Sequence, residues 1–547
     1  MTVEVLGIDL GTTNSVVATV DGDGEVLVLA NAMGEETTAS VVYFDPVGEN
    51  RNGAATVIVG SEARVLAAAD PDNGVMLVKR HMGTEFTVHV AGQSHTPESI
   101  SALILRQLVA AATRSASPRA VITVPAYFGT AEREATIQAA RIAGLDVLEL
   151  VDEPVAAAMH YGLAGGSDRT ILVYDLGGGT FDTTILHVHE GNITVIATDG
   201  HNKLGGADID ERLLNLVLAR VERDISTSDY DNFVDNPSAL GELRVDVERA
   251  KKALSQSTSR DLLVRTTSGS MRIKLTRADL EDACSDLFAT TLELIERVRA
   301  EARGKGVDVI DEVIMVGGSS RIPMLTDALE AALALQPRLV EPDLAVAKGA
   351  AIRAHQLAAT SEYEVWLRRR QGLLSPSTSN FTAATRTSTS NVLLAEVRPT
   401  VTAVSPRAVG VLVHDSFDES GTRRFVEHLV AANTMLPVKV MKQYATIQDA
   451  QESVRIQVYE QAGARPSDEI DHNRLVIDGE LTGFGDLAAG SVIEVTLDIA
   501  SDGRITVSAV EPVTKTVLNL EAFVAGVIDS RETDALTARI SLMTVRG

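Results

Sequence analysis

The sequence contains little of what several classes of protein require. One cysteine, Cys284, occurs among 547 residues, so an internal disulfide and a thiolate cage for a metal are both excluded. Aromatic residues make up only 4%, and 49 Lys and Arg face 75 Asp and Glu, which gives a formal net charge of -26. We therefore expect neither stacking on nucleic acid nor docking on an anionic membrane over most of the surface.

Long apolar runs are also missing. No uninterrupted apolar run reaches the length of a membrane-spanning helix, and the N-terminus shows no charged-then-apolar leader. Hydrophobic residues still make up 45% of the chain, which is enough for large cores, and the length allows several domains. The composition predicts a multidomain cytoplasmic protein with no membrane segment.

The P-loop pattern G-x-x-x-x-G-K-[ST] is absent, but another glycine turn is present. Between two apolar runs, Asp175–Asp182 reads DLGGGTFD, which predicts a strand, a tight turn and a second strand. Gly177–Gly179 carry no side chains, so their N–H groups are bare to an anion such as phosphate. Asp175 and Asp182 could hold Mg²⁺, and Thr180 adds a hydroxyl. The alternative is an ordinary hairpin loop.

A second copy of this pattern lies near the N-terminus. There an apolar run leads into Asp9–Asn14, which reads DLGTTN. Both copies continue with a strand, a Gly turn and a third strand, so the sequence predicts two similar α/β halves. Two acidic glycine turns that face each other would hold a polyphosphate and its metal from both sides.

Other polar residues are ambiguous from spacing alone. Glu153 is expected at the tip of a strand that ends before Pro154. Lys79 has the pattern of a surface lysine. Glu248, Lys251 and Ser255 fall on one helix face, and this spacing alone favours a solvent-exposed face over a ligand site.

The composition changes after residue 359. Residues 360–391 include a Ser- and Thr-rich tract, which predicts a linker or mobile insert. From about residue 401 to 520 the hydrophobic pattern has period two, with turns predicted at Asp478-Gly479 and Asp502-Gly503, which indicates an antiparallel β domain. Residues 521–547 can form at most a short helix.

With these motifs in hand, the chain resembles the 70 kDa heat-shock chaperone family of the bacterial DnaK type. The likeness covers residues 1–357 strongly and 404–515 more weakly. It rests on Gly7–Ser15, Val121–Phe128, Tyr174–Asp182, Val316–Pro323 and Val346–Ala351.

The resemblance implies a fold and a domain order. It implies a duplicated, actin-like (ribonuclease H-like) α/β ATPase domain in residues 1–358, and an insert and linker in 359–403. An antiparallel β-sandwich that binds peptides would follow in 404–520, and a short tail in 521–547. The implied activity is that of an ATP-dependent chaperone, which hydrolyses ATP slowly and binds and releases extended apolar segments of unfolded proteins. A J-domain co-chaperone and a nucleotide-exchange factor are the implied further partners.

The resemblance also assigns roles to residues. Lys79 would help to place the attacking water, while Glu153, Asp175 and Thr180 would order that water and the γ-phosphate. The carboxylates expected to organise Mg²⁺ and flanking monovalent cations such as K⁺ are Asp9, Asp175 and Asp182. The residues expected to bind ATP or ADP are Gly11, Thr12, Thr13, Asn14, Gly177, Gly178, Gly179, Thr180, Gly205, Gly206, Glu248, Lys251, Ser255, Gly317, Gly318, Ser319, Arg321 and Asp343. The residues expected to line the peptide groove are Val411, His414, Tyr444, Ile447, Val454 and Ile456.

The chain departs from the family's pattern in several places. The tail is too short for the family's helical lid. The linker aligns with either Asn391–Val397 or Pro399–Val404. The family's basic positions that receive the acidic linker and the J-domain read Ile137 and Glu149 here. We therefore expect ATP to change peptide affinity by less than about tenfold.

Two alternative functions remain open at this point. A nucleotide-gated scaffold could use the β domain to hold one dedicated protein. An ATP-using enzyme of the actin-like superfamily, such as a sugar kinase, is disfavoured by the β domain and by the lack of sugar-pocket chemistry.

Overall fold

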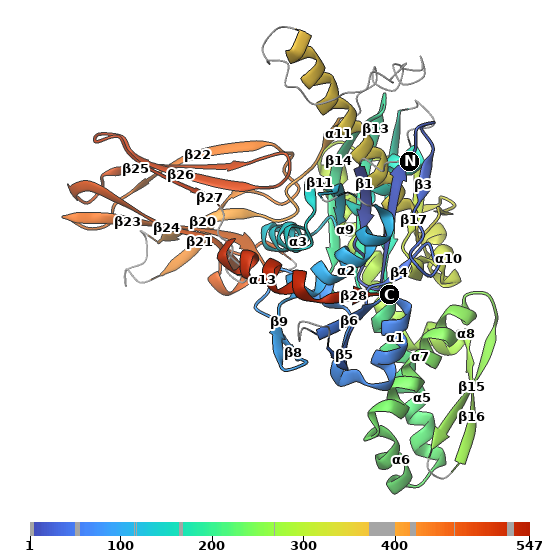
Figure 1. Cartoon of the computed structure of the whole chain (residues 1–547). Helices are drawn as coiled ribbons and strands as arrows, with labels where there is room; N and C mark the ends of the chain where they lie inside the picture. Colours follow the sequence, from blue (N-terminus) through green and yellow to red (C-terminus); the bar gives the residue numbers. More distant parts are fainter. Residues whose placement is uncertain are drawn as a thin grey trace.

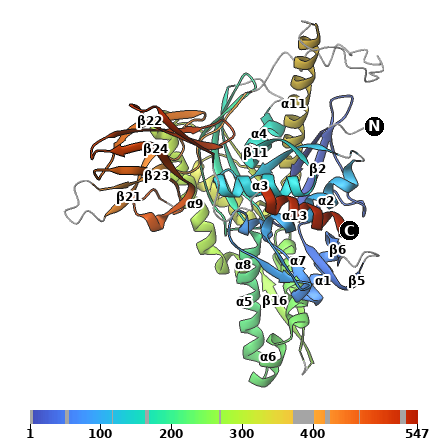
Figure 2. The same ribbon diagram turned by 60° about the vertical axis from the view of Figure 1, so that its left-hand side comes forward.

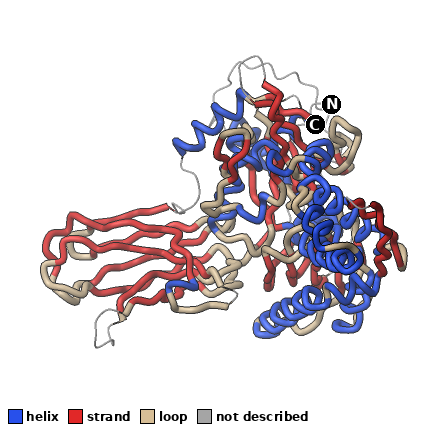
Figure 3. The backbone as a smooth tube through the Cα atoms, turned by 90° about the horizontal axis from the view of Figure 1, so that it is seen from below, coloured by secondary structure: helices blue, strands red, loops and turns tan. Residues whose placement is uncertain are grey.

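An α/β body and a β-sandwich lie side by side in this protein, and the sandwich projects from one flank of the body (Figure 1). The computed structural model describes residues 5–49, 55–113, 115, 117–162, 168–266, 269–370, 400–415, 423–463, 465–521 and 530–547. Seen from below, nearly all the helices belong to the body, whereas the sandwich consists mainly of strands (Figure 3).

Two sheets of the body share one design. Their strand orders are β11-β10-β1-β2-β3 and β18-β17-β12-β13-β14. In each, an antiparallel hairpin, β1–β2 or β12–β13, is joined by a parallel strand, β10 or β17. The predicted duplication is therefore confirmed. The strands are β1 (Val5–Asp9), β2 (Asn14–Val20), β3 (Val26–Val28), β10 (Arg119–Val124), β11 (Asp146–Asp152), β12 (Arg169–Leu176), β13 (Phe181–His189), β14 (Asn192–His201), β17 (Glu312–Val316) and β18 (Arg338–Leu339).

Helices α4 (Glu153–Gly162) and α11 (Ala345–Arg370) join the two halves. α11 packs against β1, β2 and α4, and α4 packs against β12 and β13. The approach is close because glycines lie at the crossings. A Cβ on Gly7 would lie 2.0 Å from the backbone nitrogen of Ala351, and one on Gly349 would lie 1.7 Å from the carbonyl oxygen of Ala156.

The remaining elements of the body surround these sheets. A small sheet contains β5 (Val42–Glu49), β6 (Ala55–Val59) and β7 (Gly74–Val75). Two further pairs of strands form hairpins, β8–β9 (Val88–Val90, Gln93–His95) and β15–β16 (Ser259–Thr266, Gly269–Thr276). The short strand β4 (Thr38–Ala39) pairs with β2. The further helices are α1 (Ser61–Ala69), α2 (Pro97–Ala112), α3 (Thr130–Ile142), α5 (Gly206–Asp224), α6 (Thr227–Val234), α7 (Pro237–Leu254), α8 (Arg277–Ala283), α9 (Ser285–Gly304) and α10 (Pro323–Leu333). None of the helices in the described ranges is long and apolar enough to cross a membrane.

The sandwich is formed by two antiparallel sheets, β21-β20-β23-β24 and β22-β25-β26-β27. Their inward side chains form a separate apolar core, in which Val458, Val476 and Leu497 are fully buried. The predicted antiparallel β domain is confirmed. The strands are β20 (Val409–His414), β21 (Arg424–Val430), β22 (Val438–Ala445), β23 (Gln451–Gln461), β24 (Asn473–Leu487), β25 (Val492–Ile499), β26 (Ile505–Glu511) and β27 (Thr516–Glu521).

The turn predicted at Asp478-Gly479 is wrong, because β24 runs straight through it. A Cβ on Gly479 would lie 2.2 Å from a methyl carbon of Leu520 on β27. The glycine therefore serves close packing between the two sheets, not a reversal of the chain.

The region between body and sandwich differs in part from the expectation. α11 continues to Arg370, so the first residues of the predicted insert are helical. Val401 and Thr402 form strand β19, which pairs in parallel with β14, and Thr400 donates two hydrogen bonds to Asn192 Oδ1. The docked strand falls within Pro399–Val404, the second of the two linker alignments. Residues 391–397 and the polar tract lie outside the described residues.

The tail forms more than the short helix expected. Helix α13 (Ser530–Leu542) is followed by strand β28 (Thr544–Arg546), which pairs in parallel with β6 of the body. Ile540 is fully buried in the body's core, and α13 lies beside α3 in both views (Figures 1 and 2). The described part of the tail thus packs against the α/β body rather than over the sandwich.

Candidate functional site

The two glycine turns face each other in direct contact. A Cβ on Gly178 would lie 1.8 Å from Thr13 Oγ1, and one on Gly179 would lie 2.3 Å from Thr12 Cγ2. The residues opposite each glycine leave no space for a side chain, so only glycine allows this approach. The two bare-backbone turns predicted from the sequence therefore meet, and the region around their contact is called the cleft below.

A partly buried arginine, which the sequence reasoning missed, fixes the second turn. Arg80 Nε donates to the carbonyl oxygen of Gly179 at 2.9 Å, and its guanidinium forms a two-pronged ion pair with Asp208 at 3.2 and 2.5 Å. Asp208 also accepts from the backbone N–H of Gly205, whose own Cβ position lies 2.6 Å from Gly179 N. The only sequence signal for Arg80 was its position next to Lys79.

Lys79 is a buried lysine and not the surface residue that its spacing alone suggested. It lies on a 3₁₀ turn (Val78–His81) after Leu77, which adopts a left-handed φ of 57°. Its Nζ donates to Glu153 Oε1 at 2.6 Å, with both side chains less than a tenth exposed. Burial acts to lower the pKa of Lys79, but the carboxylates of Glu153 and Asp9 outweigh it and raise that pKa, so the ammonium stays charged.

Three further carboxylates lie around this pair. Asp175 and Asp182 are direct cross-strand partners on β12 and β13, and Asp9 ends β1, where it accepts from Thr123 at 3.1 Å. Burial, and then the charge of Glu153, raise the pKa of Asp9 to about 7 and raise the pKa values of Asp175 and Asp182 as well.

This carboxylate cluster fits a bound cation. Asp182 Oδ1 is buried without a hydrogen-bond partner among the described residues. Oxygen ligands of this kind suit Mg²⁺, and a cation there would offset the repulsion that raises the pKa values.

A third glycine turn closes the cleft beside the first two. Gly317 adopts a φ of 82°, and a Cβ there would lie 2.4 Å from Asp175 Oδ1. Ser319 Oγ donates to the carbonyl oxygen of Gly177 at 2.9 Å. Gly318 approaches Asp343, whose carboxylate pairs with Arg321 at 2.5 Å. Gly317 and Ser319 therefore contact the second glycine turn or the aspartate that flanks it.

Helix α7 brings the predicted adenosine residues to the same cleft. Lys251 Nζ is buried and donates to the carbonyl oxygen of Gly206 and to Asp210, at 2.8 and 2.7 Å. Glu248 pairs with Lys252 at 2.7 Å and approaches Arg64 at 3.6 Å, while Ser255 caps the C-terminus of the helix.

Arg64 is a second residue that the sequence reasoning missed. It also donates to the backbone oxygen of Thr13 and to Asn14 Oδ1, at 3.1 and 3.2 Å. Because Glu248 lies on α7, in the second half of the body, this arginine bridges the two halves across the cleft.

The six predicted peptide-groove residues separate into two groups. Val411 and Ile456 lie inside the sandwich core, and Tyr444 and Val454 pack against it. Tyr444 also donates to Glu427 at 2.9 Å. Two side chains remain exposed outside this core, Ile447 and His414.

A cavity of about 300 Å³ lies between the body and the sandwich. Residues of α3 and β11 line one wall, and Val404, Ile499 and Asp502 line the other. Glu149, on the body side, pairs with Arg353 at 2.7 Å. Arg353 thus pairs with the carboxylate that stands where the family has a basic residue.

Comparison with known proteins places the whole arrangement in one family. A model of the Hsp70 protein family matches residues 5–91, 84–369 and 417–542. The chaperone protein DnaK of Thermosipho melanesiensis is 36% identical over 517 residues, which cover 92% of this chain and 78% of the relative. The chaperone protein DnaK of Thermotoga maritima is 36% identical over 518 residues, with the same coverage of both chains. The chain belongs to the Hsp70 family.

As a member of that family, the protein is an ATP-dependent molecular chaperone. The Hsp70 motifs found in the sequence converge on one place: the two glycine turns, the Gly317 loop and α7 meet there. Arg80, Asp208, Asp210 and Arg64 complete the cleft from positions that no motif in the sequence marked.

Proposed function

We propose that this Hsp70 chain hydrolyses ATP slowly in the cleft between the two glycine turns. The observation that carries the proposal is the buried Lys79–Glu153 pair, which lies among three carboxylates at the place where the two turns touch. Phosphoryl transfer to water needs positioning and charge stabilisation rather than covalent chemistry from the protein, and this cleft offers both.

Each part of the cleft has a role in this proposal. The bare N–H groups of both turns and the hydroxyls of Thr12, Thr13 and Thr180 hold the phosphates. Bound with the nucleotide, Mg²⁺ supplies positive charge to the phosphate oxygens. Asp9, Asp175 and Asp182 would hold that cation, directly or through water.

The charged pair orders the water. Lys79 keeps its proton, because its neighbours are carboxylates, and it orients a water oxygen towards the γ-phosphate together with Glu153. Adenosine lies against α7, next to Glu248, Lys251 and Ser255, with Arg321 and Asp343 on the facing loop.

Single-turnover hydrolysis tests this assignment. Lys79→Ala and Thr180→Ala are each expected to slow hydrolysis at least tenfold, about 1.4 kcal/mol of barrier, while nucleotide still binds. Lys274→Ala, an exposed lysine on β16, is the matched control and should hydrolyse at the wild-type rate. Wild-type rates in both cleft variants would remove the proposed site.

For the sandwich we propose a groove that binds extended apolar segments of unfolded polypeptides. Such segments add backbone hydrogen bonds at a sheet edge and place alternate side chains in pockets. The family membership supports this role, and so does the cluster of Val411, Tyr444, Val454 and Ile456 in and against one core. A J-domain protein and a nucleotide-exchange factor are the proposed further partners, in the cytoplasm.

A further inference from the structure

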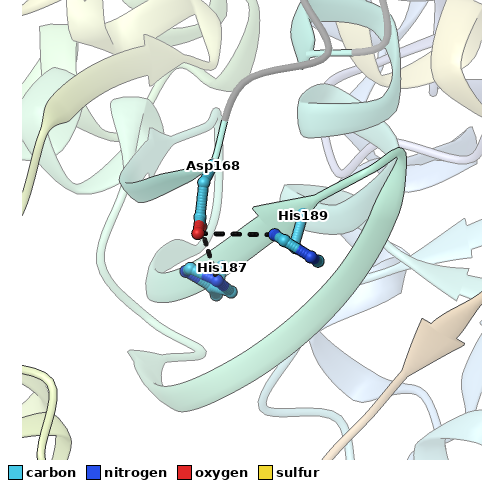
Figure 4. A group of neighbouring side chains, drawn as sticks. All are labelled: Asp168, His187 and His189. Atoms are coloured by element: carbon cyan, nitrogen blue, oxygen red, sulfur yellow. Dashed lines mark ion pairs between the residues drawn. The ribbon is translucent and has the colours of Figure 1, made fainter.

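Two histidines and an aspartate converge at the open end of the β12–β13 hairpin. His187 and His189 are two residues apart on β13, so their side chains leave the same face of the sheet. Asp168 precedes β12 and points between the two rings (Figure 4). The three side chains offer donor atoms that all lie within 4.8 Å of one another.

The contacts within this trio are short. Asp168 Oδ1 lies 2.8 Å from His187 Nε2, and Asp168 Oδ2 lies 3.4 Å from His189 Nδ1. The two imidazole rings are nearly parallel, with an angle of 10° between their planes. Both rings thus present a nitrogen to the same carboxylate.

We propose that Asp168, His187 and His189 form a binding site for Zn²⁺ or a similar borderline divalent ion. Two imidazole nitrogens and one carboxylate oxygen are the donor set of open zinc sites, in which water takes the fourth position. Mg²⁺ and Ca²⁺ prefer oxygen ligands and are poor matches for two imidazoles.

Side chains at the surface would have to move to form a tetrahedral site. At a metal–nitrogen distance of about 2.0–2.1 Å, neighbouring ligand atoms of such a site are about 3.3 Å apart. Asp168 now approaches His187 through Oδ1, at 2.8 Å, and His189 through Oδ2, at 3.4 Å, so its carboxylate would turn to place one oxygen near both rings. The donor atoms of the trio lie within 4.8 Å of one another, so the two imidazole nitrogens would also move closer together.

The surroundings of His187 also fit a metal ligand. Its second nitrogen, Nδ1, lies 3.4 Å from Thr170 Oγ1, which can accept the proton on that nitrogen and leave Nε2 free for a metal. The side chains of His187, His189 and Asp168 are 37%, 55% and 62% exposed, so an ion can enter from solvent.

This site is separate from the nucleotide cleft. The glycine turn Gly177–Gly179 closes one end of the hairpin, whereas His187 pairs with Thr170 near the other end. Substitutions in the trio should therefore leave ATP turnover unchanged, and turnover can serve as the folding control.

The proposal is tested by letting the protein compete with a zinc-sensitive chromophore for Zn²⁺. The protein is the full chain without a tag, freed of metal with a chelator, and excess Mg²⁺ is present throughout. The wild type should bind one Zn²⁺ with a micromolar or lower Kd, and His187→Gln and His189→Gln should each weaken it at least tenfold. Asp168→Asn should weaken binding too. His414→Gln and His472→Gln, each a histidine outside the trio, should bind as the wild type does. Absence of stoichiometric Zn²⁺ binding, or equal affinity in the trio variants and the wild type, would overturn the site.

Discussion

The carboxylate of Glu460, in the sandwich, caps a helix of the ATPase domain. It accepts from the backbone N–H of Thr130, the first residue of α3, at 3.1 and 3.3 Å, and from the Thr130 hydroxyl at 3.0 Å. A negative charge is stabilised at this end of a helix by the macrodipole. Arg407, also from the sandwich, lies 3.5 Å from Glu460 and pairs with Glu132 of α3 at 3.1 Å. The two domains are therefore held together by buried charges at the start of α3.

Glu460→Gln should weaken the docking of the sandwich on the body. The variant removes the charge from three hydrogen bonds, and bonds to charged groups contribute roughly 1.5–3 kcal/mol each to stability. Hydrogen exchange of the first amides of α3 should quicken, because the domains separate more often. Glu480→Gln, an exposed glutamate on β24, is the control. Unchanged exchange in Glu460→Gln would show that other contacts hold the domains.

ATP should change the affinity of the sandwich for a fluorescent apolar peptide by less than about tenfold, compared with ADP. The described part of the tail packs against α3 and β6 of the body, so it does not cover the sandwich and cannot slow peptide exchange there. A ligand shifts an equilibrium only by its different affinity for the two states. A difference of a hundredfold or more would contradict this expectation and would direct attention to the Glu460–Thr130 contact. We also expect little stimulation of turnover by a generic J-domain protein.

Val454→Phe should reduce peptide affinity in the same assay. Val454 packs at the margin of the sandwich core, opposite Leu481 on β24, so a larger ring would occupy the predicted pocket. Val517→Phe, at a half-exposed valine of β27, controls for the added ring. If both variants bind peptide like the wild type, the groove lies elsewhere.

The contribution of His95 to the stability of the body should fall between pH 7 and pH 5. Burial, and then the charge of Arg539, lower the pKa of His95 to about 4, whereas in the unfolded chain it is near 6.5. Between these values His95 binds more protons in the unfolded state, so its contribution to the free energy of unfolding falls as the pH falls, by about 2 kcal/mol at pH 5.

His95→Leu isolates this contribution. The leucine variant lacks the titrating ring but can still pack against Phe44, whose ring centroid lies 4.6 Å from that of His95. Denaturant unfolding at pH 7 and pH 5 measures the difference between the two proteins. An identical pH dependence in wild type and variant would exclude His95 as its source.

Local sequence was sufficient for the phosphate turns and most of the strands. The triple glycine of Gly177–Gly179, its flanking aspartates and the apolar runs on both sides act over a few residues, where spacing alone fixes strand and turn. The repeat of that pattern around Asp9 was enough to predict the duplicated fold and the facing turns. Period-two alternation likewise indicated the antiparallel β domain from about residue 401 to 520.

Only the tertiary structure determined which side chains from distant parts of the chain pair with one another. Arg80 with Asp208 and Glu149 with Arg353 meet because sheets and helices pack side by side, and no periodicity in the sequence records such pairings. Gly479 resembled a turn residue, but the packing of Leu520 against it made it part of a strand. The tail likewise depended on its surroundings: α13 and β28 are stable here because the body offers a core for Ile540 and an edge on β6. An ion pair or a docked strand requires both partners in place, and the second partner is positioned by the fold.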